Sequence, residues 1–146
     1  MTPDLEVRRA DRAAILGLRV RVLSSPDVRV GALPLDFDRE TRHWAALVGG
    51  EIVGCVSVMR LRGYVLRGMA VSPEHQRRGV GGALMRVVGA EVLAPMWCNA
   101  RVGVVGFYAR TGWSAVGPVF DLEHRGPHQR MIWAGPVDCV DDDRGR

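Results

Sequence analysis

The residues best suited to chemistry in this 146-residue chain lie in one glycine-rich loop. From residue 71 to residue 84 the sequence is VSPEHQRRGVGGAL, between an expected strand and an expected amphipathic helix. The first amides of a helix are unpaired and its N-terminus is positively polarised, so together they can bind an anion. Glycines let a phosphate approach these amides, and arginines add positive charge. The residues that would surround the anion are Gln76, Arg77, Arg78, Gly79, Val80, Gly81 and Gly82.

Two other kinds of phosphate loop fit this spacing less well. A Walker A loop needs a lysine, and all 20 basic residues of the chain are arginines. A dinucleotide-binding loop needs an acidic residue at the end of the next strand, where this chain has Asn99. The alternative for the loop alone is a glycine-rich helix start with two solvated arginines.

Hydrophobic periodicity and turn residues indicate the elements that would position this loop. The expected strands are Leu5–Arg9, His43–Val48, Glu51–Arg60, Tyr64–Val71, Met96–Ala100, Trp113–Val116, Val119–Glu123 and His128–Ala134. The expected helices are Asp11–Leu23, Val80–Val92 and Val102–Arg110. Ser24–Arg39 is expected to be mostly loop, with one short helix as an alternative. A strand–helix–strand passage inside a meandering sheet predicts a mixed α/β (α+β) fold. Residues 1–137 are expected to form one domain and residues 138–146 a polar tail.

A second motif follows the expected helix. Residues 97–101 are WCNAR and residues 106–113 are GFYARTGW. These segments resemble the N-A-R…F-Y-x-x-x-G-F/W block of the GNAT acetyltransferases, and QRRGVG at residues 76–81 resembles that family's Q/R-x-x-G-x-G/A signature. The resemblance covers about residues 41–116 and extends more weakly to the end of the chain. Two motifs in this order, separated by one helix and one strand, point strongly to the family.

The resemblance implies both a fold and a co-substrate. The implied fold has a mixed, mostly antiparallel central sheet with flanking helices, in which the parallel strands 4 and 5 splay apart around acetyl-CoA. These strands correspond to Tyr64–Val71 and Met96–Ala100. The backbone of the loop would hold the pyrophosphate. The other cofactor-binding residues that the resemblance implies are Met69, Ala70 and Val71, through their backbone, Asn99 and Tyr108.

Tyr108 is the candidate catalytic residue. Acyl transfer to an amine requires that the amine lose a proton, that the thioester oxygen receive a donor, and that the leaving thiolate gain a proton. By resemblance, Tyr108 has the position of the family's tyrosine acid beside the cofactor sulfur, and a phenol with a pKa near 10 suits that task. The alternative is that Phe107 and Tyr108 are an aromatic pair that packs a short helix.

The sequence does not single out a general base or an acceptor. The strand Tyr64–Val71 carries no carboxylate, where some relatives have a glutamate. The candidate bases, each of which could equally be a structural or solvated polar residue, are His43, Asp121, Glu123 and His128. Arg67 could bind a carboxylate or phosphate of the acceptor, or it could pair at the surface. An acidic segment could attract a cationic amine or be a solvated loop; its members are Asp36, Asp38 and Glu40.

Composition restricts the remaining functions. Three sparse cysteines and unpaired histidines argue against a disulfide framework and against a metal site. The charged N-terminus argues against a signal peptide, no apolar run approaches a membrane span, and a cytoplasmic location is expected. Two of the cysteines and all four tryptophans are expected in the core: Cys55, Cys98, Trp44, Trp97, Trp113 and Trp133.

Three functions remain in order of support. The first is acetyl transfer from acetyl-CoA to a primary amine, and the second is an acyl-CoA sensor without turnover. The third is nucleic-acid binding, which only the net charge of +4 and the pI of about 9.6 favour, since the arginines are evenly spread. Acetyl-CoA and an amine are therefore the expected partners, with no nucleic acid and no membrane. The chain is expected to be a monomer or a homodimer, in which His128–Ala134 could pair as an edge strand.

Overall fold

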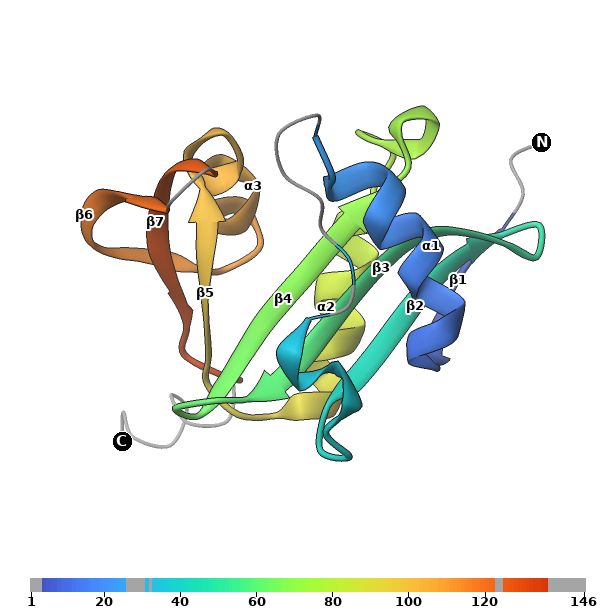
Figure 1. Ribbon diagram of the computed structural model, residues 1–146, viewed down its shortest axis with the longest axis horizontal. Helices are drawn as coiled ribbons and strands as arrows, with labels where there is room; N and C mark the ends of the chain where they lie inside the picture. The colour runs from blue at the N-terminus through green and yellow to red at the C-terminus, as the bar shows by residue number, and fades with distance from the viewer. Residues whose placement is uncertain (1–3, 26–30, 32, 123–124, 137–146) are drawn as a thin grey trace, which may run out of the picture.

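A seven-stranded mixed sheet forms the centre of the computed structural model, which describes residues 4–25, 31, 33–122 and 125–136 (Figure 1). The spatial order of the strands is β1-β2-β3-β4-β5-β7-β6. In this sheet β4 and β5 run parallel, and all other neighbours are antiparallel. The strands are β1 Leu5–Ala10, β2 Arg42–Val48, β3 Glu51–Arg60, β4 Tyr64–Val71, β5 Met96–Arg101, β6 Ser114–Leu122 and β7 Gly126–Trp133. This arrangement confirms the expected fold class.

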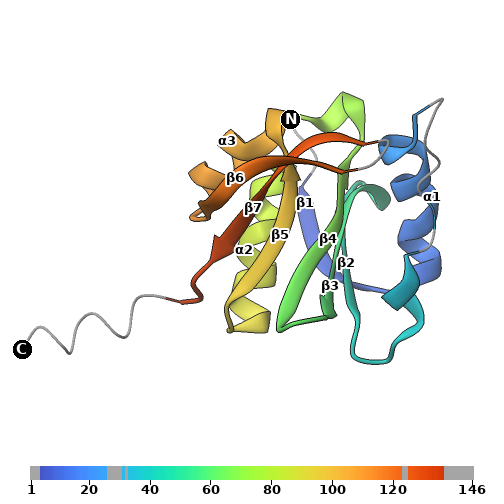
Figure 2. The ribbon, with the colours of Figure 1, turned by 60° about the vertical axis from the view of Figure 1, so that its left-hand side comes forward.

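Helices cover both faces of the sheet (Figure 2). Helix α1 (Arg12–Leu23) and the short helix η1 (Pro34–Phe37) lie on one face, and α2 (Val80–Val92) lies on the other. Two further short helices, η2 (Pro73–His75) and η3 (Val102–Val104), precede α2 and α3 (Val105–Arg110). We call the two sides of the sheet the α1 face and the α2 face.

The two faces have separate apolar cores. Helix α2 buries Val80, Leu84 and Val88, whose spacing of four residues places them on one side of a helix. They pack with Trp44 and Met131 in the largest cluster. On the α1 face a smaller cluster joins Ile15 and Leu18 of α1 to the sheet. As expected, Cys55 and Cys98 are buried in these cores.

The two parallel strands pair over only two residues. Tyr64 lies opposite Met96 and Val65 lies opposite Trp97, and no later pair between β4 and β5 is present along these two fully described strands. Beyond that point β4 leans away from β5, and the loop after β4 lies at the open end (Figure 1). We call the space between the diverging strands the V. The expected splay of the parallel pair is therefore present.

Three details of the C-terminal part differ from expectation. A single strand, β6, replaces the two expected segments at 113–116 and 119–123, because the chain continues through a register shift between Val116 and Phe120. Gly117, with φ +77°, lies in that irregular step, where glycine avoids the strain of a left-handed conformation. Strand β7 lies between β5 and β6, so the expectation of an edge strand at 128–134 is wrong. The expected helix at 102–110 begins as the 3-10 helix η3.

Candidate active site

The glycine-rich loop lies, as expected, at the start of α2. The first helical backbone bond runs from the amide of Ala83 to the carbonyl oxygen of Gly79, 3.0 Å away. The amides of Val80, Gly81 and Gly82 therefore have no carbonyl partner within the helix. Arg77 and Arg78 are exposed beside them. This arrangement can bind an anion through backbone N–H groups.

Two glycines of the loop are required for different reasons. Gly79 has φ +85°, a left-handed conformation that costs other residues about 1–2 kcal/mol. Gly81 packs against the ring of Phe107 in α3, and a Cβ atom at this position would lie 3.0 Å from two ring atoms. Gly81 thus allows the first turn of α2 to approach α3. Gly82 is more open, because a Cβ atom there would have Nη1 of Arg86 as its nearest neighbour, at 3.7 Å.

Gln76 has a different contact from the expected one. Its side-chain amide donates a hydrogen bond of 2.9 Å to the carbonyl oxygen of Val71, at the end of β4. In this structure the side chain fixes the strand end relative to the loop, and the Val71 carbonyl is already bonded. Gln76 therefore holds the loop against the end of β4.

Strand β4 contains a bulge immediately before its end. Ser57 pairs with Arg67 and Cys55 pairs with Ala70, so Gly68 and Met69 together lie opposite Val56. Gly68 has φ +67°, and a Cβ atom there would lie 2.8 Å from Nε of Arg19. After Val65 the edge of β4 that faces the V has no strand partner among the described strands. Backbone groups that face this open edge can pair with an extended ligand.

Tyr108 is buried in the α2-face core, with 7% of its surface exposed. Its ring makes edge contacts with Phe107 and Trp113, at centroid distances of 5.3 and 5.4 Å. Its hydroxyl hydrogen-bonds the thiol of Cys98 on β5. Burial, followed by the neighbouring Cys98, raises the pKa of Tyr108. The hydroxyl therefore stays protonated near neutral pH.

Asn99, the residue expected to reach the cofactor from β5, is exposed and already has a partner. Its Oδ1 accepts a hydrogen bond of 2.8 Å from Nε of Arg130. The Arg130 guanidinium lies 4.3 Å from the centre of the Trp97 ring, within the range of a cation–π contact. Both Trp97 and Trp133 are only partly buried, whereas Trp44 and Trp113 belong to the core.

The candidate bases are spread over the molecule. His43 lies on β2 with both ring nitrogens bonded, to Ser57 and to the Asp36 backbone. Asp121 is exposed on β6, and Glu123 lies outside the described residues. His128 is buried on β7 opposite Arg101 of β5, and its Nδ1 is 2.8 Å from the carbonyl oxygen of Gly126. A carbonyl only accepts, so Nδ1 carries the proton of this hydrogen bond.

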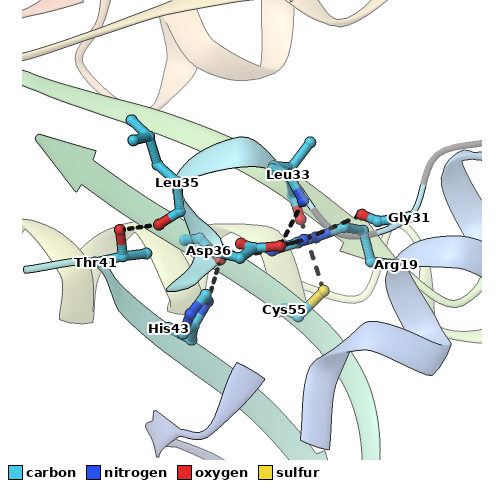
Figure 3. Close-up of polar contacts among 10 residues, drawn as sticks. Arg19, Gly31, Leu33, Leu35, Asp36, Thr41, His43 and Cys55 are labelled. Atoms are coloured by element: carbon cyan, nitrogen blue, oxygen red, sulfur yellow. Dashed lines mark hydrogen bonds and ion pairs between the residues drawn. The ribbon is translucent and has the colours of Figure 1, made fainter. Parts of the chain in front are cut away.

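A buried ionic network on the α1 face was missed by the sequence analysis (Figure 3). Arg19 and Asp36 form an ion pair of 2.7 Å, and both side chains are fully buried. Arg19 also donates to the Ser57 hydroxyl at 2.9 Å and to the Gly31 carbonyl at 3.3 Å. The signal in the sequence was that Arg19 lies four residues after Ile15, on the apolar side of α1.

This network determines the protonation of His43. The Ser57 hydroxyl accepts from Arg19 and keeps its own proton, with which it can donate to Nδ1 of His43, 2.6 Å away. The other ring nitrogen donates to the carbonyl of Asp36. Burial lowers the pKa of His43; the charge of Asp36 opposes this shift and that of Arg19 adds to it. His43 is thus a neutral structural residue, with no nitrogen left to act as a base.

The acidic segment is not a cation site in this structure. Asp36 forms an ion pair with Arg19 and accepts a hydrogen bond of 2.6 Å from the Leu33 amide. Asp38 is exposed and caps the amide of Glu40. Glu40 lies 3.8 Å from Arg60, whose strand position pairs with Tyr64 at the closed end of the V. None of these three carboxylates lies at the open end, so the expected attraction of a cationic amine lacks support.

A groove of about 760 Å³ runs along α2 on its outer side. It begins at Gly82 and Arg86, passes Gly89 and ends at residues 133–136, with Arg110 of α3 on its other wall. It contains no residue of β4 or β5, so it is separate from the V. Within the described ranges no group of three His, Cys, Asp or Glu side chains could hold a metal ion. No helix in the described part is long and apolar enough to cross a bilayer.

Comparison with known proteins decides the family. The family model described as "Acetyltransferase (GNAT) domain" matches residues 39–115, just over half of the chain. The chain belongs to the GNAT acetyltransferase family. This GNAT protein is also 35% identical over 69 residues to the uncharacterized N-acetyltransferase YitI of Bacillus subtilis. That match spans 44% of this chain and 46% of the relative, so the chain aligns with about half the length of YitI.

Solved structures confirm the fold of this GNAT protein. Escherichia coli ElaA superimposes with a TM-score of 0.69 at 19% identity, covering 89% of this chain and 99% of ElaA. An IAA acetyltransferase from Bacillus cereus gives 0.72 at 16% identity, covering 90% and 99%. An aminoglycoside 6'-N-acetyltransferase in complex with coenzyme A gives 0.71 at 15% identity, covering 88% and 96%. At these identities the likeness establishes the fold alone.

Proposed function

We propose that this GNAT protein transfers an acetyl group from acetyl-CoA to a primary amine by direct attack. The observation that carries the proposal is the unpaired edge of β4 beside a helix start with open amides. An extended pantetheine arm carries amides that can pair with such an edge, as an added strand would. Its pyrophosphate would then meet the amides of Val80, Gly81 and Gly82.

The groove along α2 offers a place for the remaining part of coenzyme A. Arg86 lies over Gly82, and Arg110 lies over Gly106 at the start of α3; their Nη1 atoms are 3.7 and 3.2 Å from the positions that a Cβ atom would take at these glycines. Both guanidinium groups are exposed and line the groove that begins at the loop. Two arginines beside the pyrophosphate site suit the third phosphate group and the adenosine of the cofactor.

The chemistry requires one bond exchange and one proton exchange. The amine nitrogen attacks the thioester carbonyl carbon, so a C–N bond forms as the C–S bond breaks. The amine loses a proton, and the CoA thiolate gains one. We assign the donor at the sulfur to Tyr108, whose raised pKa keeps its hydroxyl protonated. This hydroxyl already bonds a sulfur, that of Cys98 on the strand that borders the V.

Replacing Tyr108 by phenylalanine tests this assignment. We expect Tyr108→Phe to lower kcat by about 100-fold or more, because a proton donor in the transition state contributes on that scale. Acetyl-CoA affinity should stay within a few-fold of the parent, since the ring and its packing remain. Turnover is measured as thiol release with a panel of primary amines, and affinity is measured by the shift in thermal unfolding. At 100 times its dissociation constant, acetyl-CoA should stabilise the protein by about 2.7 kcal/mol.

The chain provides a matched control, because its only other tyrosine is Tyr64. Tyr64 lies at the closed end of the V, where its hydroxyl meets Arg60 at 3.2 Å. Tyr64→Phe should retain turnover. Equal loss in both variants, or none in Tyr108→Phe, would remove Tyr108 from the chemistry. Binding of acetyl-CoA without turnover of any amine would favour a sensor, a function for which neither the described residues nor the comparisons offer an observation.

A further inference from the structure

Arg67 lies on β4 two residues after the last residue that pairs with β5. Val65, two residues earlier, packs with Leu33 and Met59 on the α1 face, whereas Leu66 faces the core under α2. Side chains of a strand alternate, so Arg67 lies on the α1 face with Val65. Val65 is also the last β4 residue that pairs with β5. Arg67 therefore borders the V at the point where the strands part.

Arg67 is half-buried and has no hydrogen bond or ion pair with any described residue. Burial lowers its pKa, and the positive charges of Arg125 and Arg19 lower it further, opposed by the charge of Asp36. An arginine nevertheless remains charged, so its five N–H groups stay donors in a partly desolvated place. A buried charge without a partner is costly unless an anion compensates it.

The neighbouring charges do not supply that anion. Asp36, the carboxylate that opposes the shift, is bonded to Arg19 at 2.7 Å and to the Leu33 amide at 2.6 Å. Arg130, on the other side of the V, shows what a satisfied arginine looks like, because it stacks on Trp97 and bonds Asn99. Among the described residues Arg67 has neither kind of contact. The donor groups of Arg67 are thus left unmatched by the described part of the chain.

We propose that the acceptor amine carries an anionic group, a carboxylate or a phosphate, and that Arg67 binds this group at the mouth of the V. The inference rests on the proposed acetyl transfer, because it places the amine beside the thioester. A guanidinium group can hold a carboxylate or a phosphate through two parallel N–H···O bonds, which fixes the orientation of the rest of the molecule. Arg125, in the turn between β6 and β7, adds positive charge near Arg67.

Acceptors in matched pairs test the proposal. Each pair differs by its anionic group: phenylalanine and phenethylamine, lysine and cadaverine, and phosphoethanolamine and ethanolamine. We expect the full-length protein to acetylate the anionic member of at least one pair about 10- to 100-fold more efficiently in kcat/KM, the range of a hydrogen bond to a charged group. The first two pairs report a carboxylate and the third reports a phosphate. Equal or better use of the members without the anion would overturn the proposal.

Variants of Arg67 then identify the group responsible. Arg67→Gln should remove the preference by raising KM for the anionic member about 10- to 100-fold, with the other member unchanged, and Arg67→Lys should restore part of it. Arg39→Gln removes an equal charge from an exposed turn and should leave KM unchanged for both members of a pair. Because Arg67 has no partner to lose among the described residues, Arg67→Gln should not lower the melting temperature.

The failure of this inference differs from a failure of the proposed function. A protein that does not bind acetyl-CoA contradicts the proposed function itself. If acetyl-CoA binds and only amines without an anionic group are acetylated, acetyl transfer stands and the anionic acceptor is excluded. If Arg67→Gln lowers kcat/KM equally for both members of a pair, or lowers the melting temperature, Arg67 supports the fold and does not bind the acceptor.

Discussion

The two faces of the sheet are stabilised by different means. The α2 face has an apolar core of Val80, Leu84 and Val88 against the strands, and its proposed ligand contacts are backbone amides. The α1 face contains a buried ionic network around Arg19 and Asp36, which connects α1, η1 and β3. The proposed cofactor site therefore depends on glycines and backbone shape, whereas the α1 face depends on buried side chains that bond one another.

The difference implies that the two faces tolerate change differently. On the α2 face a substitution can block the amides without exposing the core. On the α1 face the loss of one partner leaves a charge buried without compensation, because Arg19 and Asp36 are both shielded from water. The network also supports the bulge of β4, since Gly68 leaves room for Nε of Arg19. A substitution in this network should affect the V only indirectly, by lowering the stability of the fold.

The largest effect is expected from breaking the ion pair. Arg19→Met should lower the free energy of unfolding by about 3–5 kcal/mol, because Asp36 is left charged and buried without its partner. The measurement is a urea titration at pH 7.5. Near this pH the folded fraction should still bind acetyl-CoA with parental affinity, since the amides of the loop lie on the opposite face.

A double variant separates the lost pair from lost packing. Arg19→Met with Asp36→Leu removes both charges, so it should recover part of the stability that the single variant loses. If the double variant is as unstable as the sum of the two single variants, the ion pair makes no special contribution. If acetyl-CoA affinity falls in proportion to stability, the two faces are not independent in the way that the structure indicates.

A smaller effect is expected from a methyl group on the α2 face. Gly81→Ala would place its Cβ 3.0 Å from the Phe107 ring and must move α2 away from α3 or turn the ring. We expect acetyl-CoA affinity to fall about tenfold or more, with a cost in stability of about 1–3 kcal/mol from overpacking. Isothermal titration with acetyl-CoA and urea titration measure the two quantities.

Gly17 in α1 is the matched control for this variant. It is also a helical glycine, but a Cβ there would meet nothing within 4 Å. Gly17→Ala should raise the free energy of unfolding by about 0.5–1 kcal/mol, through the better helix propensity of alanine, and leave affinity unchanged. Parental affinity in Gly81→Ala would show that the approach of α2 to α3 does not matter for the cofactor.

The contrast between the faces also explains which parts could be predicted from the sequence. The loop before α2 was predictable, because glycine spacing and period changes are local signals, and the splay of β4 and β5 was predictable only from the family resemblance. The position of β7 between β5 and β6 was not, since pairing order depends on long-range contacts. The Arg19 network was missed because its partners lie 12 to 38 residues away along the chain. The roles of Tyr108 and Asn99 at a cofactor stay predictions.

The smallest expected effect concerns pH and the buried ring of His43. Burial lowers the pKa of His43 below its ordinary value of 6.5, so near that pH the unfolded chain binds a proton that the folded chain does not. The stabilising contribution is therefore present above pH 6.5 and is lost as the pH falls toward the folded pKa. The contribution of His43 to the free energy of unfolding cannot change by more than about 1.4 kcal/mol per pH unit, the limit for one proton.

Urea titrations at pH 7.5 and 5.5 measure this loss in the parent and in His43→Gln. The carboxylates titrate in both proteins, so the difference between the two pH dependences isolates the histidine. His43→Gln should be less stable at pH 7.5, because it disturbs the bonds to Ser57 and Asp36, but it should lose less stability on acidification. Identical pH dependences would mean that His43 can accept a proton inside the folded network. The interior of the α1 face would then accommodate an added charge more readily than its buried ion pair implies.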